Sequence, residues 1–345
     1  MAKRRPTDDK PTMAEIAELA GVSKPTVSKV INQQPGVAAA TRERVERIIA
    51  ERGYVRNGAA RALSVGQIGS MNLVVSEVDS PYFVEIIRGV EETLESAALS
   101  MVLTSTHEEE RRHRRWMARV LEYGTDGVIL VLPDEHASSV EELRRHGIPF
   151  AVVDDRGESL PDVPSVGATN FAGGFAATEY LLSLGHRRIA AIGGQPYKCT
   201  MARLAGYRAA LQEGGVPIDP LLVQPGSFNA EAGYAAASAL LDLRQLPTAI
   251  FAGNDMQAMG VYRALYERGL RVPDDMSVVG FDDVPLVALL TPALTTVRQP
   301  VRQMGALATR MLLQIAVGGV LESTRVELAT SLVVRESCGP PRRLG

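Results

Sequence analysis

The residues best suited to chemistry in this sequence of 345 residues stand where expected strands end or where an expected helix starts. They carry hydroxyl, carboxylate, amide, guanidinium and aromatic groups, and they are Ser80, Tyr82, Asp154, Arg203, Phe228, Asn254 and Asp282. Doubly wound parallel sheets bind ligands beyond the carboxyl ends of their strands, so we expect these side chains to gather at such an edge. Charged and amide groups pair with sugar hydroxyls, while an aromatic ring packs on the apolar sugar face. The set therefore predicts a site for a polyhydroxylated ring.

Several of these positions also have a purely structural interpretation. Asp255 and Asp283 directly follow the candidate residues Asn254 and Asp282, and they are most simply explained as helix N-caps. Asn254 could be a turn residue, Arg203 could pair with a surface acid, and Phe228 could pack in the core instead of against a sugar. The sequence alone leaves these interpretations open.

Acid–base catalysis is the main alternative chemistry, because carboxylates stand side by side at positions 154–155 and 282–283. Consecutive side chains usually point apart, so neither pair forms a natural dyad. The sequence contains no dinucleotide fingerprint, Walker A loop, HExxH or GxSxG motif, and its five histidines form no cluster. We therefore expect no enzymatic activity, no catalytic residue, no metal and no cofactor.

A second stretch with chemical character lies near the N-terminus, at residues 12–32, and predicts a helix-turn-helix. Thr12 and Glu15 fit a capping box, Gly21 fits a tight turn, and Ser23 fits the cap of a second helix. The outward residues at the start of that helix are Lys24, Pro25, Thr26, Ser28 and Lys29. Small polar and basic side chains in this place suit the major groove of DNA, although a solvated helical hairpin is the simpler alternative.

The residues that follow make the DNA-binding interpretation specific. A third helix is expected over 39–52, and an N-x-x-A-R-x-L segment follows at 57–63. With ELAGVS, TVSKVIN and TRERVERIIAERGY, these features resemble the headpiece and hinge of the lactose-repressor (LacI/GalR) family of bacterial transcription regulators. The resemblance continues to about residue 337.

The resemblance implies that the hinge segment folds on DNA, where Asn57, Arg61 and Leu63 contact it. Leu63 would wedge into the minor groove, although it could instead be an interdomain packing residue. Two positions depart from the family pattern. Ala38 replaces a frequent capping serine or threonine, and Gly58 lies inside the hinge, where glycine costs about 1 kcal/mol of helix propensity.

Beyond the hinge, expected strands alternate with amphipathic helices, which is typical of parallel sheets, and the pattern restarts near Asn170. We expect an α/β protein with a helix-turn-helix headpiece, a hinge helix and a two-lobe body with parallel sheets, which resembles type I periplasmic binding proteins. The expected parts are a disordered basic arm (1–11), the DNA-binding domain (12–52), the hinge and linker (53–66) and a ligand-binding and dimerisation body (67–345). Within the body, we place the first lobe at about 67–166 and 301–328, and the second at about 167–297 and 329–345.

The family resemblance also sharpens the expected ligand site. Arg203 in R-L-A-G-Y, Asn254 in G-N-D and Asp282 in V-V-G-F-D-D match positions that contact the effector in this family. The looser matches are Asp154, Phe228 and Gln299. From the first lobe, Ser80 and Tyr82 lie in the loop that would meet the ligand.

Charge and cysteine content agree with a regulator that works beside DNA. Residues 1–63 hold twelve basic and seven acidic residues, whereas the rest holds twenty-five and thirty-three, so a basic head precedes an acidic body. The two cysteines form no C-x-x-C pair, and the N-terminus lacks an apolar signal segment. We expect a cytoplasmic protein that has reduced thiols and is not embedded in a membrane.

Together these features predict a homodimeric DNA-binding repressor that a small neutral sugar releases from a pseudo-palindromic operator. The C-terminal tail has no leucine heptad, so we expect a dimer and not a tail-tethered tetramer. Among neutral sugars, a resemblance to actinobacterial regulators favours a pentose or a fragment of plant polysaccharide. The alternative keeps the fold but has a corepressor or phosphoprotein that strengthens DNA binding.

Overall fold

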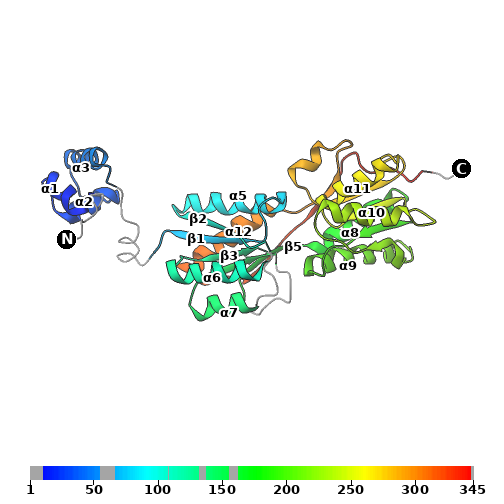
Figure 1. Cartoon of the computed structure of the whole chain (residues 1–345), viewed down its shortest axis with the longest axis horizontal. Coiled ribbons are helices and arrows are strands. Elements are labelled where there is room, and N and C mark those ends of the chain that lie inside the picture. The colour runs from blue at the N-terminus through cyan, green and yellow to red at the C-terminus, as the bar shows by residue number, and fades with distance from the viewer. Residues whose placement is uncertain (1–10, 55–66, 108, 132–136, 155–161, 343–345) are drawn as a thin grey trace, which may run out of the picture. The chain divides into compact units, whose positions relative to one another are not determined.

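The computed structural model in Figure 1 divides into two compact units, residues 1–68 and 69–345, which are described separately. The described residues are 11–54, 67–107, 109–131, 137–154 and 162–342. In these ranges no helix has both the length and the apolar character needed to cross a membrane.

The described part of the first unit contains three short helices, α1 (Met13–Leu19), α2 (Lys24–Ile31) and α3 (Ala39–Arg52). The predicted capping box of Thr12 and Glu15 is present, and the Ser23 side chain accepts a hydrogen bond from the Thr26 backbone. Gly21 has a φ of +62°, as the predicted tight turn requires. A small apolar core joins the three helices through Ile16, Ala17, Ala20, Val27, Val30 and Val45.

Helix α3 begins without a side-chain cap, as the sequence suggested. Its N-cap residue Ala38 makes no side-chain hydrogen bond, so the first amides of the helix gain nothing from it. At the other end Gly53 adopts the left-handed conformation, with φ of +60°, and closes the helix. The start of α3 is therefore the weaker of its two ends.

The described residues of the second unit form two six-stranded sheets, and the first is parallel throughout. Its strand order is β11 (Arg325–Leu328), β5 (Ser165–Ala168), β4 (Phe150–Val153), β3 (Val128–Val131), β1 (Ser70–Val75) and β2 (Ser100–Ser105). Two helices, α5 (Pro81–Ser96) and α12 (Val301–Ala316), pack on one face, while α6 (Glu110–Tyr123) and α7 (Ala137–Arg145) pack on the other. Side chains alternate between the two cores along each strand, so Leu73 joins the α5–α12 layer and Val74 joins the α6–α7 layer.

The second sheet repeats this design. Its order is β12 (Ser331–Val333), β10 (Thr295–Arg298), β9 (Ser277–Asp282), β8 (Ala249–Ala252), β6 (Ile189–Ile192) and β7 (Val223–Gln224), with only β12 antiparallel to its neighbour. Its helices are α8 (Asn170–Ser183), α9 (Lys198–Glu213), α10 (Ala230–Leu241) and α11 (Asp255–Glu267), with short turns η1 (Pro220–Leu222) and η2 (Pro285–Leu289). The predicted α/β class with parallel sheets is confirmed.

The chain passes between the two sheets three times. It leaves β5 for α8, leaves β10 for α12, and leaves β11 for β12 (Figure 1). The hydroxyls of Thr169 and Thr330 lie 3.0 Å apart and join two of these passages. The sequence pattern did not predict the strands β5, β10, β11 and β12, because each mixes polar and apolar residues and lacks the continuous apolar run of β3, β4, β6 and β8.

Helices α8 and α9 approach unusually closely, and glycine makes this possible. A Cβ atom added at Gly206 would lie 2.1 Å from the Phe171 carbonyl oxygen, and one at Gly174 would lie 2.2 Å from the Arg203 carbonyl oxygen. Both positions therefore exclude any side chain. The contact holds the first half of α9, including Arg203, against the start of α8.

The missing cap of α3 gives a direct stability prediction. Ala38→Ser should supply a side-chain acceptor for the first turn and stabilise α3 by about 1 kcal/mol. Hydrogen exchange of the full chain should then show slower exchange at the amides of residues 40–42. As a matched control, Ala40→Ser places the same side chain inside the helix, where it should speed exchange slightly. Equal exchange in both variants would contradict the capping account.

Candidate functional site

A cavity of about 220 Å³ lies beyond the carboxyl ends of strands from both sheets. Seven of the eight residues predicted to bind a ligand line it: Ser80, Tyr82, Asp154, Arg203, Phe228, Asn254 and Asp282. Gln299 does not line the cavity. We call this space the effector cavity.

Arg203 is the cation of the effector cavity and is only 4% exposed. Its Nε donates to Asn170 Oδ1 at 2.8 Å, and one terminal nitrogen donates to the Gly253 carbonyl at 2.6 Å. The guanidinium carbon also lies 3.8 Å from the centre of the Phe281 ring, a favourable cation–π contact. The alternative of a surface ion pair is therefore wrong. The helix also begins earlier than expected, at Lys198, so Arg203 lies in its second turn.

Asp282, at the end of β9, supplies a buried carboxylate opposite this cation. Its Oδ1 lies 3.8 Å from Arg203 and accepts a hydrogen bond from Gln299 Nε2 at 2.6 Å. Gln299 thus stands behind Asp282 and holds it. Burial raises the pKa of Asp282 to about 6, although the Arg203 charge acts in the opposite direction. The φ of Asp282 is +116°, a backbone conformation that residues other than glycine rarely adopt.

The expected roles of the neighbouring acids need correction. Asn254, and not Asp255, caps α11, where its Oδ1 accepts from the Gln257 amide at 2.9 Å. Asp255 is fully buried, and it accepts hydrogen bonds from Thr296 Oγ1 at 2.6 Å and from the Val284 amide at 2.8 Å. Burial raises its pKa well above the ordinary value. Asp255 therefore ties α11 to β10 and to the loop that follows β9, instead of capping a helix.

Asp283 is not a helix cap either. Its carboxylate accepts from Arg298 Nε and from Arg335, in both cases at 2.6 Å. The acid that directly follows Asp282 thus points away from the effector cavity and into an ion-pair network. The expectation that consecutive carboxylates point apart is met here.

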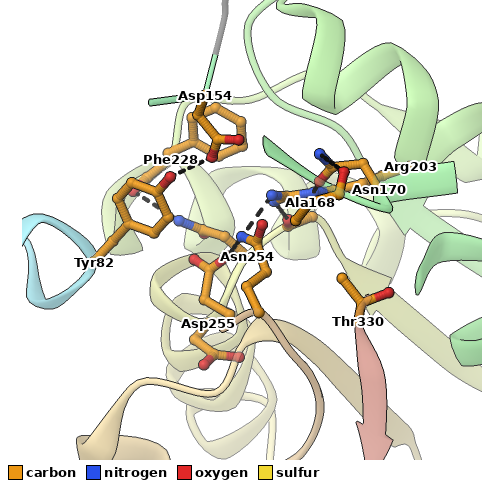
Figure 2. Close-up of polar contacts among 12 residues, drawn as sticks. Tyr82, Asp154, Ala168, Asn170, Arg203, Phe228, Asn254, Asp255 and Thr330 are labelled. Carbon is orange, nitrogen blue, oxygen red and sulfur yellow. Dashed lines mark hydrogen bonds and ion pairs between the residues drawn. The ribbon is translucent and has the colours of Figure 1, made fainter. Parts of the chain in front are cut away.

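The first-sheet side of the effector cavity carries a tyrosine–carboxylate pair (Figure 2). The Tyr82 hydroxyl, from α5, donates to the Asp154 carboxylate at the end of β4. Burial raises the pKa of Tyr82, and the adjacent Asp154 charge raises it further. Asp154 has a φ of +50°, so Asp154 and Asp282, two of the carboxylates that line the cavity, sit on backbone in the left-handed region. Ser80 is the N-cap residue of α5 by its backbone conformation, but its side chain makes no capping hydrogen bond.

An aromatic wall completes the effector cavity. The half-buried Phe228 ring has its centre 6.1 Å from that of Tyr197 and 5.9 Å from the Arg203 guanidinium carbon. The Asn254 amide donates to the Phe228 carbonyl at 3.2 Å and fixes the loop that carries this ring (Figure 2). Phe228 therefore faces the cavity and is not a core residue.

Sequence reasoning missed several residues that line the effector cavity, namely Ser76, Glu77, Gln195, Tyr197, Cys199 and Ser227. Three of them follow β6, in the Gly-Gly-Gln-Pro-Tyr segment and the first turn of α9. The position of that segment after an apolar strand was the available signal.

Helix α2 presents the predicted DNA-reading residues. Lys24, Pro25 and Lys29 are exposed, whereas Thr26 and Ser28 are half-buried. The Thr26 hydroxyl lies 2.9 Å from that of Ser23, and the Ser28 hydroxyl accepts from Asn32 at 3.2 Å. The two hydroxyls thus already have partners within the headpiece, so the lysines are its most available polar groups here. The predicted hinge contacts Asn57, Arg61 and Leu63 lie outside the described residues.

Both units of the chain resemble parts of known proteins. Residues 12–57 match the sequence profile described as bacterial regulatory proteins, lacI family, and residues 178–338 match the periplasmic binding protein-like domain. The ribose operon repressor of Escherichia coli (strain K12) is 36% identical over 328 residues, which cover 94% of this chain and 99% of that protein.

Solved structures agree along nearly the whole chain. A transcriptional regulator CelR–cellobiose complex matches with a TM-score of 0.74 and 36% identity, covering 95% of this chain and 99% of that one. The lac repressor dimer bound to operator and the anti-inducer ONPF matches with a TM-score of 0.84 and 29% identity, again covering 95% and 99%.

The raised pKa of Asp282 predicts a stability cost at neutral pH. As pH rises from about 4 to 6, the unfolded state loses this proton first, so the free energy of unfolding falls. Asp282→Asn removes this dependence. The variant should therefore gain roughly 2 kcal/mol over the unmodified protein between pH 4 and pH 7.5. Denaturant unfolding at both pH values measures this difference, and a difference that does not change with pH would contradict the buried-acid account.

Proposed function

Because this chain belongs to the lacI family of bacterial regulatory proteins, we propose that it represses transcription as a homodimer until a small neutral sugar releases it from its operator. That it is a DNA-binding transcriptional repressor, and not an enzyme, follows from the family. What we propose is the identity of the effector, whether it weakens or strengthens DNA binding, and which residues contact it. We also propose that it works in the cytoplasm, because a repressor of this family acts on DNA.

The observation that carries the sugar proposal is the composition of the effector cavity. Among the described residues that line it, Arg203 is the only basic one, whereas Glu77, Asp154 and Asp282 contribute carboxylates. This excess of acids disfavours a polyanion. Hydroxyl groups suit it, because each can donate to a carboxylate and accept from the guanidinium or an amide. The Phe228 and Tyr197 rings offer an apolar wall for one face of the sugar ring.

Two neutral sugar classes have support among the similar proteins. The E. coli relative is a ribose operon repressor, which favours a pentose, and the CelR structure contains cellobiose, a disaccharide derived from plant polysaccharide. A thermal-shift screen with ribose, xylose, arabinose and cellobiose tests both classes, with glucose 6-phosphate as the anionic comparison. Stabilisation by glucose 6-phosphate alone would overturn the neutral-sugar assignment.

The proposed mechanism couples two sites through the two lobes. Sugar contacts come from α5 and β4 on the first sheet and from α9, α11 and β9 on the second, so the sugar favours one arrangement of the lobes. Release from DNA requires that this arrangement bind the operator less well. In the headpiece, α2 reads the major groove, and Leu63 of the hinge acts as a minor-groove wedge that kinks the operator.

Lys24 should contribute to operator sequence preference as well as affinity. Lys24→Ala removes an exposed cation from the first residue of α2, so we expect at least a threefold loss of affinity and a changed base preference. Binding selection on randomised half-sites measures both quantities. Arg47→Ala, on the exposed face of α3, removes the same charge from the same headpiece, and it should leave the base preference intact. An unchanged preference in Lys24→Ala would remove α2 from the reading role.

Arg203 should be needed for the ligand response and not for DNA binding. Arg203→Lys keeps the charge but loses the planar fork that spans Asn170 and Gly253. An unpaired buried group costs about 1–3 kcal/mol, so sugar affinity should fall roughly tenfold to a hundredfold. Operator affinity without sugar should stay within about twofold, because the headpiece is unaltered.

Calorimetry for the sugar and fluorescence anisotropy for the operator test Arg203→Lys. The variant should remain on its operator at sugar concentrations that release the unmodified protein. If the effector is instead a corepressor, the variant should fail to bind the operator when sugar is added. Normal sugar affinity in the folded variant would place the effector site elsewhere.

A further inference from the structure

The outward face of α6 carries a row of arginines without acidic partners. Arg111, Arg115 and Arg119 are exposed, and none of them pairs with an acid among the residues that the structure describes. They follow one another at intervals of four residues, so they form a single line along the helix, about 12 Å long. We call this line the arginine stripe.

The buried side of α6 fixes the direction in which the arginine stripe points. Trp116, Met117 and Val120 pack in the core between this helix and the first sheet. The stripe occupies the opposite side of the same helix, so it faces away from the sheet and toward solvent.

The glutamates at the start of α6 do not neutralise the arginine stripe, because other arginines hold them. Glu109 pairs with Arg112 at 3.1 Å, and Glu110 pairs with Arg114. The remaining acid of α6, Glu122, is exposed and lies three residues beyond the last arginine of the stripe. The outward face thus keeps three positive charges against one negative charge.

The charge of α6 also contrasts with that of the rest of the body. After residue 63 the chain has twenty-five basic and thirty-three acidic residues, whereas α6 alone has five arginines and two glutamates. Helix α5, on the other face of the first sheet, has four glutamates and one arginine (Figure 1). Like charges four residues apart destabilise a helix, and a polyanion lying along α6 would relieve this repulsion.

The arginine stripe runs toward the point where the chain enters the second unit. Directly after α6, Asp126 Oδ2 accepts hydrogen bonds from the Gly69 amide at 2.6 Å and the Ser70 amide at 3.1 Å. The Thr125 hydroxyl donates to the Ser70 carbonyl at 3.2 Å. The headpiece precedes this point in the chain, so DNA held by the headpiece is connected to this end of α6. Tyr123, the last residue of α6, is 72% exposed there and offers a hydroxyl group.

We propose that the arginine stripe binds phosphate groups of the DNA that flanks the operator, in addition to the contacts of the headpiece. A DNA duplex presents about one phosphate for each 1.7 Å of its axis, so every arginine along a 12 Å line can meet one. Such contacts add affinity and salt dependence but do not read bases. The proposal rests on the DNA-binding function of the family and is independent of the sugar proposal.

Operator duplexes of two lengths test the proposal on the full-length dimer. One duplex ends at the operator obtained by selection on randomised half-sites, and the other extends it by two helical turns on each side. The longer duplex should bind more tightly. Its binding constant should also fall more steeply with salt, because the logarithmic slope changes by about 0.9 for each phosphate contacted. A dimer has two stripes, so we expect the slope to be steeper by at least 2.

Three combined variants show whether the arginine stripe causes the length effect. Replacing its arginines by glutamine keeps the helix propensity but removes the charge, so the length effect should disappear. Replacing them by lysine keeps the charge and should preserve the effect, since a phosphate contact does not require the planar fork. A matched control removes three exposed arginines from other elements and should leave the effect unchanged: Arg208→Gln, Arg244→Gln and Arg310→Gln.

Equal salt slopes on the two duplexes for the unmodified protein would overturn the proposal and leave the arginine stripe to an acidic protein or to solvent. A length effect that survives the glutamine variant would place the extra DNA contact on another surface. A length effect that the control variant also loses would reflect net charge alone. Either result would overturn the proposal, whereas loss in the glutamine variant only, with recovery in the lysine variant, would support it.

Discussion

The second lobe is built around a buried guanidinium, that of Arg203, which must be compensated without water. Removing such a charge from solvent costs several kcal/mol unless partners replace the lost hydration. The partners are the Phe281 ring below it, the Gly253 carbonyl, the Asn170 amide oxygen and the more distant Asp282 carboxylate. Several elements must meet for this to happen, and the glycine contact between α8 and α9 brings Asn170 within reach. The effector cavity is the space that these elements leave at the sheet edge.

Two polar groups near the effector cavity, neither of which lines it, lack a hydrogen-bond partner within the protein. Among the described residues, Gln299 Oε1 and Thr200 Oγ1 are buried without a hydrogen-bond partner, and both belong to residues that pack around Asp282 or α9. Asp154 and Asp282 lie on backbone in the left-handed region. Such features reduce stability and are typical of sites that are completed by a ligand.

The sequence predicted most of this architecture because local rules suffice for it. Capping residues located the headpiece helices, and apolar runs followed by polar residues located the strands whose ends meet at the effector cavity. The sequence did not predict features that depend on contacts between residues far apart in the chain. Asp255 resembles a helix cap but is tied by Thr296 and Val284, which come from other strands and loops. The strands β5, β10, β11 and β12 mix polar and apolar residues and so lack a continuous apolar run. The start of α9 has no capping signal, so Tyr197 and Lys198 were missed.

The central claim is that the sugar site in the body and the operator site in the headpiece bias the same two arrangements of the protein. The most direct test measures the sugar Kd by calorimetry twice, once for the free dimer and once for the dimer saturated with operator. The account predicts weaker sugar binding to the operator complex, by the same factor by which saturating sugar weakens operator binding. The same sugar Kd in both states, for a sugar that occupies the effector cavity, would contradict it.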